Sequence, residues 1–231
     1  MKILLHTCCA PCSTYVVDKL RKDGYDDITS LWYNPNIHPY TEYKMRRDTL
    51  KEYAKQINLP LIIEENYGIR EFTKNVSSNI DGRCLYCYES RLEYTAKYAK
   101  EHGYEAFSTT LLVSPYQKHE LIIKVANEMA RKYQIEFLYQ DFREGFRIGQ
   151  QMARDAGLYM QKYCGCVFSE EMRYNNHNTT KPSIPNGYEI PREPRMQVKK
   201  IENKEDYIDL LLEADPSKDM IHKYLNDSDV Y

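Results

Sequence analysis

The sequence ILLHTCCAPCSTYVVDKL, residues 3–20, decides the fold of this chain. Residues 2–7 predict a buried strand, and apolar side chains from 15 to 20 recur at helical spacing. Between them lies the stretch Cys8-Cys9-Ala10-Pro11-Cys12, which puts three thiols on the loop where the strand ends and the helix begins. The rest of the chain is organised around this loop.

The same alternation of strand and helix continues along the chain. Further strands are predicted at 27–32, 61–64, 106–111 and 136–139, and helices at 41–57, 91–102, 117–133 and up to about 156. Short links between these elements indicate parallel strands joined by right-handed crossovers. We therefore expect an α/β fold with an open, twisted parallel sheet flanked by helices.

The composition is that of an ordinary globular protein, with 42% hydrophobic and 29% charged residues in 231. No apolar run approaches the roughly 20 residues of a membrane span, and we expect no membrane partner. The formal net charge of −2 provides no general attraction for nucleic acid. Any contact with RNA would need a local basic patch.

The character of the chain changes after Tyr174. Residues 175–194 contain four prolines without a periodic pattern, which is typical of a linker. Two short helices are predicted beyond it, at 210–214 and 220–225. We thus expect an α/β domain at 1–174 and a linker with a small helical C-terminal extension at 175–231.

All seven cysteines fall in three clusters, and a protein that used cysteine merely as a small hydrophobe would scatter them. The clusters are Cys8, Cys9 and Cys12; Cys84 and Cys87; and Cys164 and Cys166. An odd number of thiols without a secretory signal indicates a reducing compartment, so we expect a cytoplasmic protein. The clustering predicts a metal site assembled from three distant segments.

The number of thiols limits the choice of metal without deciding it. Zinc takes four ligands, so seven thiols are more than one zinc site needs and do not match two such sites. A [4Fe-4S] cubane takes four thiolates and leaves three for a second metal. Spacing favours iron–sulfur over zinc. Because adjacent side chains usually point apart, we expect one of Cys8 and Cys9 to serve a cluster and the other a second ion.

Candidate binding residues follow the predicted strands, since ligands of open parallel sheets lie beyond the carboxyl ends of strands. They are Ser114, Tyr116, Arg143 and Arg147. Arg83 and Arg91 flank the middle cysteine cluster, either as exposed helix charges or as guanidinium groups near a cluster or phosphate.

Four blocks together resemble one known family, the cobalamin-independent epoxyqueuosine reductases (QueH). The blocks are Cys8-Cys9-Ala10-Pro11-Cys12, Asp81-Gly82-Arg83-Cys84-x-x-Cys87-Tyr88-x-x-Arg91-Leu92, Thr109-Thr110-Leu111-Leu112-x-Ser114-Pro115-Tyr116, and Tyr163-Cys164-Gly165-Cys166-x-Phe168-Ser169. The match spans roughly residues 1–174. It implies an adenine-nucleotide α-hydrolase-like (HUP-like) fold.

The resemblance also implies a [4Fe-4S] cluster beside a separate mononuclear iron, with the seven cysteines as ligands. It implies reduction of epoxyqueuosine to queuosine at the tRNA wobble position. That reaction needs two electrons and two protons, and a second iron can act as a Lewis acid on the epoxide oxygen. Ferredoxin or flavodoxin would supply the electrons. Candidate proton donors adjoin the ligands in sequence: His6, Tyr88 and Tyr163. His6 is also a candidate core residue.

A wobble base must leave the anticodon stack to reach such a site, and RNA loops are held by stacking and arginine contacts. We expect the phosphate-facing surface to consist of Lys44, Arg46, Arg47, Arg143, Arg147 and Arg154.

Two alternative functions remain. An iron–sulfur tRNA thiolase is disfavoured because the 7–12 loop lacks a glycine to cradle pyrophosphate. A non-catalytic zinc-binding RNA adaptor would be colourless.

Overall fold

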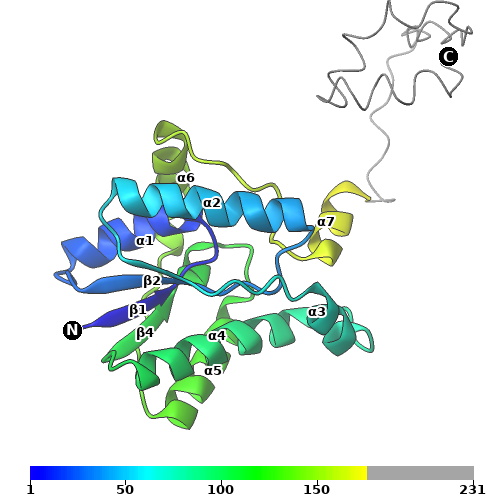
Figure 1. Ribbon diagram of the computed structural model, residues 1–231, viewed down its shortest axis with the longest axis horizontal. Coiled ribbons are helices and arrows are strands. Elements are labelled where there is room, and N and C mark those ends of the chain that lie inside the picture. Colours follow the sequence, from blue (N-terminus) through cyan, green and yellow to red (C-terminus); the bar gives the residue numbers. More distant parts are fainter. Residues whose placement is uncertain (176–231) are drawn as a thin grey trace, which may run out of the picture. The chain divides into compact units, whose positions relative to one another are not determined.

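The computed structural model describes residues 1–175, in which five parallel strands form one sheet of order β3-β2-β1-β4-β5 (Figure 1). The strands are β1 (Ile3–His6), β2 (Ile28–Trp32), β3 (Leu61–Ile63), β4 (Ala106–Thr109) and β5 (Glu136–Phe137). In the central strand, Ile3 pairs with Ile28 on one side and Ala106 on the other. The predicted α/β fold with an open parallel sheet is confirmed.

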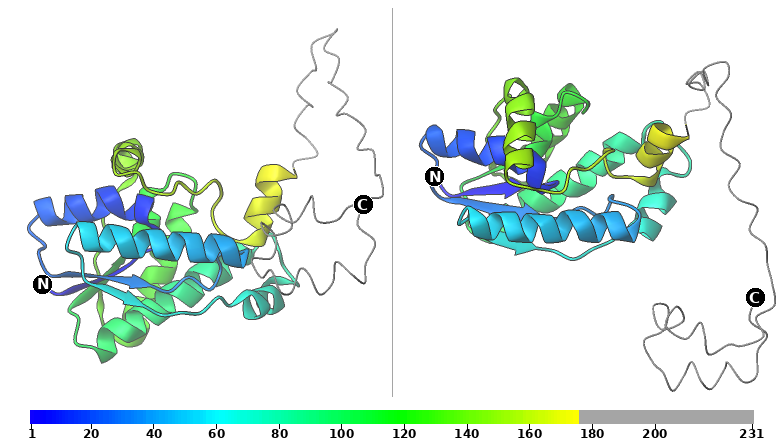
Figure 2. Two further views of the ribbon diagram at one scale, coloured as in Figure 1. Left: turned by 45° about the horizontal axis from the view of Figure 1, so that its top comes forward. Right: turned by 90° about the horizontal axis from the view of Figure 1, so that it is seen from above.

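Helices cover both faces of the sheet. They are α1 (Ala10–Lys22), α2 (Tyr40–Gln56), α3 (Ile69–Val76), α4 (Arg83–Glu101), α5 (His119–Tyr133), α6 (Phe146–Asp155) and α7 (Val167–Tyr174), with short 3-10 turns at Thr110–Val113 and Arg143–Gly145. Figures 1 and 2 show α1, α2 and α6 on one face and α4 and α5 on the other. Because both faces are covered, the first three residues of the central strand are apolar and fully buried: Ile3, Leu4 and Leu5.

The fourth helix starts earlier than expected. The sequence predicts a helix from Arg91, whereas α4 begins at Arg83 and carries Cys84 and Cys87 in its first two turns. Cys87 and Arg91 lie four residues apart on its buried side, and a buried arginine conceals the apolar periodicity on which the prediction depends. The segment before it contains α3.

Two predicted strands are too long. Strand β4 ends at Thr109 and the chain continues as a 3-10 turn, where the prediction extended the strand to 111. The fifth strand ends at Phe137 instead of 139.

The strand order reverses at β1, which has β2 on one side and β4 on the other. Connections that leave the carboxyl ends of these strands diverge to opposite faces and open a crevice, where open α/β sheets bind ligands. Cys8 follows β1 and Thr110 follows β4, and the backbone N–H of Cys8 donates to Thr110 Oγ1 over 3.1 Å. The first cysteine cluster therefore lies at this crevice.

Within residues 1–175, no helix is both long and apolar enough to span a bilayer. The predicted boundary at 174/175 and the two short C-terminal helices fall outside or at the limit of the described residues, and they stay predictions.

Replacing Leu5 by alanine should lower the free energy of unfolding by about 2–5 kcal/mol, because it opens a cavity in the central strand. The matched control is Ile148→Ala on α6, whose side chain is 56% exposed and should change stability by less than about 0.5 kcal/mol. Urea unfolding under reducing conditions measures both. Equal losses would contradict the placement of β1 at the centre of the core.

Candidate metal centre

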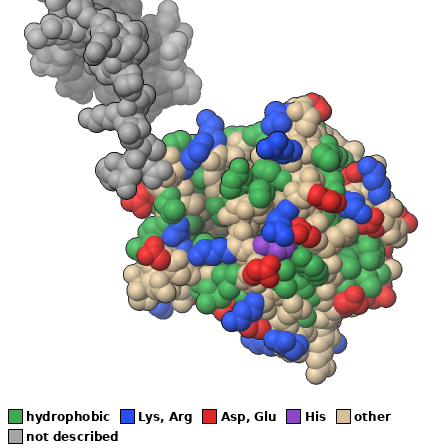
Figure 3. Space-filling model, turned by 180° about the vertical axis from the view of Figure 1, so that it is seen from behind, with side chains coloured by type: hydrophobic (Ala, Val, Ile, Leu, Met, Phe, Trp, Pro, Cys, Tyr) green, Lys and Arg blue, Asp and Glu red, His purple; other side chains and the backbone are tan. Residues whose placement is uncertain are grey.

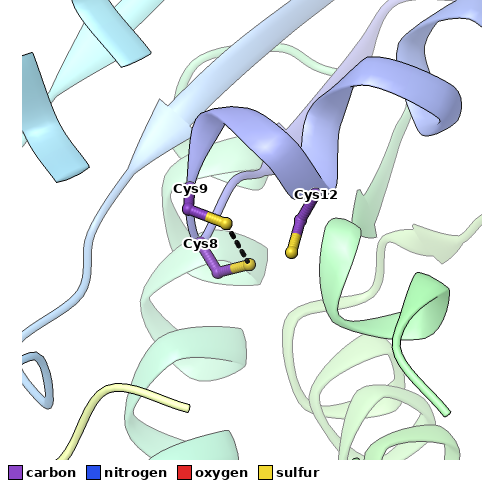
Figure 4. Close-up of side chains that lie close together, drawn as sticks. All are labelled: Cys8, Cys9 and Cys12. Atoms are coloured by element: carbon purple, nitrogen blue, oxygen red, sulfur yellow. Dashed lines mark hydrogen bonds between the residues drawn. The ribbon is translucent and has the colours of Figure 1, made fainter. Parts of the chain in front are cut away.

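Three thiols converge at the N-terminus of α1 (Figure 4). The sulfurs of Cys8, Cys9 and Cys12 all lie within 4.8 Å of one another, and those of Cys8 and Cys9 are 3.8 Å apart. Our expectation that the two adjacent side chains point apart was wrong. The backbone passes from extended geometry at Cys9 directly into the first turn of α1, and this bend turns both thiols to the same side.

Hydrogen bonds among the three thiols move their pKa values apart. Hydrogen bonding with Cys12 and Cys9 holds the pKa of the Cys8 thiol well below its usual value. Burial raises the pKa of Cys9, and hydrogen bonding with Cys8 raises that of Cys12. The three thiols therefore favour one negative charge and oppose a second and a third. A bound metal cation would offset that opposition, since thiols bind metals in their deprotonated form.

Two polar side chains donate hydrogen bonds to the triad. Gln161 Nε2 lies 3.0 Å from Cys9 Sγ and 3.7 Å from Cys12 Sγ. Thr110 Oγ1 lies 3.4 Å from Cys8 Sγ. Sequence reasoning missed the role of both residues. Thr110 stands in a block already noted for its resemblance, but nothing in the sequence around Gln161 points to a sulfur on a loop 152 residues away.

The other four thiols form a second neighbourhood. Cys84 and Cys87 lie near the N-terminus of α4, and Cys166 is the N-cap of α7. The charges of Cys164, Cys166 and Cys84 all act on Cys87, whose pKa burial raises to about 12. Each of the three cysteine clusters thus lies at a helix N-terminus, where the helix dipole favours a thiolate.

Arg91 is a buried cation between the two groups of thiols. Its side chain is 2% exposed, Nη2 donates to Cys87 Sγ over 2.9 Å, and Nε donates to the Cys87 carbonyl over 3.0 Å. Its charge also interacts with Cys164 and Cys8. Among the described residues it makes no ion pair with a carboxylate. A buried cation without a counter-charge is costly, so this site is built to contain negative sulfur.

The two arginines that flank the middle cluster therefore differ. Arg91 is buried and contacts the Cys87 thiol, so it is not an exposed helix charge. Arg83 instead lies over the ring of Phe168 at 5.7 Å and places Nη2 2.9 Å from Met172 Sδ, which ties α4 to α7.

Arg46 anchors the loop that carries Cys164. It is 2% exposed, pairs with Glu42 over 2.6 Å, and donates to the carbonyls of Tyr163 (3.0 Å) and Cys164 (2.8 Å). Tyr159 donates to the second oxygen of Glu42 over 2.6 Å. The expectation that Arg46 faces RNA phosphates was wrong, because its donors are occupied inside the protein.

The three candidate proton donors all hydrogen-bond to protein groups. His6 is fully buried between Thr109 Oγ1 (2.9 Å) and the Tyr33 carbonyl (3.3 Å), and burial, followed by the Arg91 charge, lowers its pKa to about 3. Tyr88 donates to Gln117 Oε1 over 2.6 Å. Tyr163 donates to the His38 carbonyl over 2.7 Å. Burial raises the pKa of both tyrosines. His6 thus occupies the core position anticipated for it.

A cavity of about 710 Å³ adjoins the triad, within the usual size of a small-molecule site. Its wall includes all three triad thiols, Cys164, and the expected binding residues Ser114 and Tyr116. The Tyr116 side chain is 85% exposed and meets the Phe146 ring edge-on at 5.7 Å, so the cavity opens to solvent beside an aromatic pair.

Of the basic residues expected to face phosphates, Arg46 lines this cavity, whereas Lys44, Arg47, Arg143, Arg147 and Arg154 do not. Arg143 is paired with Asp141 over 2.6 Å, and its hydrogen bonds lower the pKa of Asp141 to about 2. Arg147 is exposed on α6, and Arg47 pairs with Asp48 and Glu65. On the face seen in Figure 3, basic and acidic side chains are interspersed. That face provides no broad basic patch.

Replacing Arg46 by methionine should lower the free energy of unfolding by about 3–5 kcal/mol, because it leaves the buried Glu42 carboxylate without a partner. Arg47→Met is the matched control, since its carboxylate partners are exposed and such pairs contribute about 0–1 kcal/mol. Urea unfolding measures both, and adding Glu42→Gln to Arg46→Met should recover part of the loss. Equal effects of the two arginine variants would contradict the anchoring role.

Comparison with known proteins gives a consistent family. A family model described as epoxyqueuosine reductase QueH matches residues 3–172. A Dehalococcoides mccartyi protein named epoxyqueuosine reductase QueH is 40% identical over 178 residues, covering 77% of this chain and 97% of that protein. Proteins of the same name from Staphylococcus epidermidis and Thermotoga maritima are 36% and 34% identical, covering 73% and 76% of this chain and 76% and 93% of theirs.

Among solved structures, one described as a predicted subunit of tRNA methyltransferase from Methanocaldococcus jannaschii aligns with a TM-score of 0.45. It is 15% identical and covers 66% of this chain and 74% of that one. The fold assignment rests on the sheet order instead. With a matching model over most of the chain, close relatives across their length and the cysteine pattern gathered at one crevice, the chain belongs to the epoxyqueuosine reductase QueH family.

Proposed function

We propose that this chain reduces epoxyqueuosine to queuosine in tRNA, with loss of the epoxide oxygen as water. One observation carries the proposal: Cys8, Cys9, Cys12 and Cys164 all line the cavity. A substrate that enters this cavity would meet a metal centre held by these thiolates. Family membership supports the choice of substrate.

The geometry of the triad fits a single metal ion. An ion bound tetrahedrally through sulfur at about 2.3 Å keeps its thiolates about 3.8 Å apart. The Cys8 and Cys9 sulfurs have this separation, 3.8 Å. Thiolates of a cubane bind different irons and lie farther apart. We therefore assign the triad to the mononuclear iron, in place of the division of Cys8 and Cys9 between two centres that the sequence suggested.

Four thiols then remain, which is the number that a [4Fe-4S] cluster takes. They are Cys84, Cys87, Cys164 and Cys166. Arg91 reaches towards both groups, because it donates to Cys87 and its charge interacts with Cys8. Its fixed positive charge would offset the negative charge of the thiolates.

When bound, the cluster and the iron would supply single electrons and a Lewis acid for the epoxide oxygen. The side chains of this protein bind and orient the substrate. Tyr116 and Phe146 stand at the cavity wall, where an extruded base can stack on an aromatic ring. Lys162 and Arg173 also line the cavity and can contact backbone phosphates. Ser114 is a further candidate contact.

Protons have two possible sources. Tyr88 and Tyr163 already donate to protein acceptors, so either hydroxyl would have to release its partner before acting on substrate. Water in the open cavity is the simpler source. We further propose that Arg143 and Arg147 contact tRNA outside the cavity, that a reduced ferredoxin or flavodoxin supplies the electrons, and that the protein works in the cytoplasm.

The reaction is tested by anaerobic incubation of iron- and sulfide-reconstituted protein with epoxyqueuosine-containing tRNA and a strong reductant. Mass analysis of the nucleosides should show loss of one oxygen from the modified base, and none without iron. Fully loaded protein that leaves the base unchanged would refute the proposal. Incorporation of sulfur with ATP would favour a thiolase, and a colourless zinc protein would favour an RNA adaptor.

If the triad binds the single iron and the other four thiols bind the cluster, a cysteine-to-serine substitution in each group should remove a different metal centre. Cys12→Ser should lose about one iron per chain and keep the visible absorption of the cluster. Cys84→Ser should lose that absorption, because it removes one of four cluster ligands. Iron and sulfide analysis of both reconstituted variants measures the difference. Loss of the cluster from Cys12→Ser would show that the triad contributes a cluster ligand.

Replacing Tyr116 by alanine should lower kcat/KM for tRNA by roughly fivefold or more, since base–aromatic stacking contributes about 1–3 kcal/mol. Tyr40→Ala is the control, because Tyr40 is also exposed, at 52%, and lies on α2 away from the cavity wall. Iron content should be normal in both variants. Equal kinetics for the two would exclude stacking on Tyr116.

A further inference from the structure

A chain of three hydrogen bonds ends at the sulfur of Cys164. The backbone N–H of Lys118 donates to the hydroxyl oxygen of Tyr88 over 3.2 Å. The Tyr88 hydroxyl donates to Gln117 Oε1 over 2.6 Å. Gln117 Nε2 then donates to Cys164 Sγ over 3.2 Å. These bonds connect α4, the segment that follows β4, and the loop before α7.

The chemistry of the groups fixes the direction of this chain. A thiolate can only accept hydrogen bonds, so the NH₂ side of the Gln117 carboxamide must face Cys164. Its oxygen then faces Tyr88 and requires a donor. The Tyr88 oxygen receives the Lys118 N–H, and its single proton is directed to Gln117. Hydrogen bonds in such a chain polarise one another, so the last donor is strengthened.

Cys164 differs from the other thiols in its exposure. Cys9, Cys87 and Cys166 are buried and Cys8, Cys12 and Cys84 are partly buried, whereas Cys164 is exposed. Both Cys164 and Gln117 line the cavity. Gln117 thus supplies a hydrogen-bond donor to Cys164 from within the protein.

We propose that Gln117, held in orientation by Tyr88, is a positioning residue that sets the reduction potential of the metal centre bound by Cys164. The inference rests on the proposed function, since it concerns the iron–sulfur cofactor of that reaction. Hydrogen bonds to cluster sulfurs are among the factors that set cluster potentials. A donor at Cys164 stabilises the added negative charge of the reduced state and makes one-electron reduction easier.

Two near-isosteric variants test the proposal. Gln117→Met removes the donor, and Tyr88→Phe removes only the hydroxyl that orients it. Anaerobic redox titration of the reconstituted proteins, followed by absorption and electron paramagnetic resonance, should show more negative midpoint potentials. We expect Gln117→Met to shift the one-electron equilibrium about tenfold, or about 59 mV. Tyr88→Phe should shift it less, because the amide stays near the sulfur but is free to rotate.

The control is Gln150→Met. Gln150 lines the same cavity, and within residues 1–175 it makes no hydrogen bond to a sulfur. Its variant should leave the potential unchanged. A shift equal to that of Gln117→Met would mean that cavity polarity, and not the bond to Cys164, sets the potential, and would overturn the proposal. Unchanged potentials in Gln117→Met would also overturn it.

The double variant Gln117→Met/Tyr88→Phe tests whether Tyr88 acts on the reduction potential through Gln117 or independently of it. If Tyr88 acts through Gln117, Tyr88→Phe should add no shift in the potential of the Gln117→Met variant. Additive shifts would show that Tyr88 does not act through Gln117. Should Gln117→Met fail to retain iron, Tyr88→Phe still decides, because an unchanged potential there contradicts the orienting role.

The two proposals fail in distinguishable ways. Protein with full iron and sulfide that shifts its potential as described, yet does not convert epoxyqueuosine, would refute the reaction and leave the role of Gln117 intact. Protein that converts the substrate while all variants keep the wild-type potential would refute the role of Gln117 alone. Wild-type protein that binds no iron would refute both.

Discussion

The structure depends on accommodating negative sulfur at the centre of a folded chain. In the proposed metal-bound state, seven thiolates would repel one another and lose hydration on burial. The thiols lie at the N-termini of three helices, α1, α4 and α7, where oriented backbone N–H groups stabilise negative charge. Arg91 adds a buried positive charge, and Gln161, Gln117 and Thr110 add hydrogen bonds to individual sulfurs. Each of these groups supports the thiolates without occupying the space of a metal.

The sheet explains why these groups can meet. Parallel strands bring their carboxyl ends to one edge, and the reversal of order at β1 opens a crevice there. The triad enters from β1 and Thr110 from β4. The last cysteines come from a loop without a strand, and the buried pair of Arg46 and Glu42 fixes that loop to α2. The result is a site whose open side is the cavity lined by Tyr116.

Local patterns in the sequence were sufficient for the parallel sheet and for the three cysteine clusters, because apolar strands and closely spaced thiols are visible within short windows. Contacts between residues far apart in the sequence could not be predicted from such windows. Arg46 looked like a surface charge, since its partners at 163 and 164 lie more than 110 residues away. The convergence of Cys8 and Cys9 depends on a backbone bend that residue alternation does not predict. The contact between Arg91 and Cys87 could have been predicted, because Arg91 lies one helical turn after Cys87.

We propose that the thiols hold two different iron centres. Mössbauer spectroscopy of protein reconstituted with iron-57 distinguishes these centres, because cluster iron and a separate thiolate-bound iron give different signals. We expect two signals in a ratio of about four to one, from a [4Fe-4S] cluster and one further ion. A single cluster signal with no second iron, or protein that takes up zinc and no cluster, would contradict the presence of two iron centres.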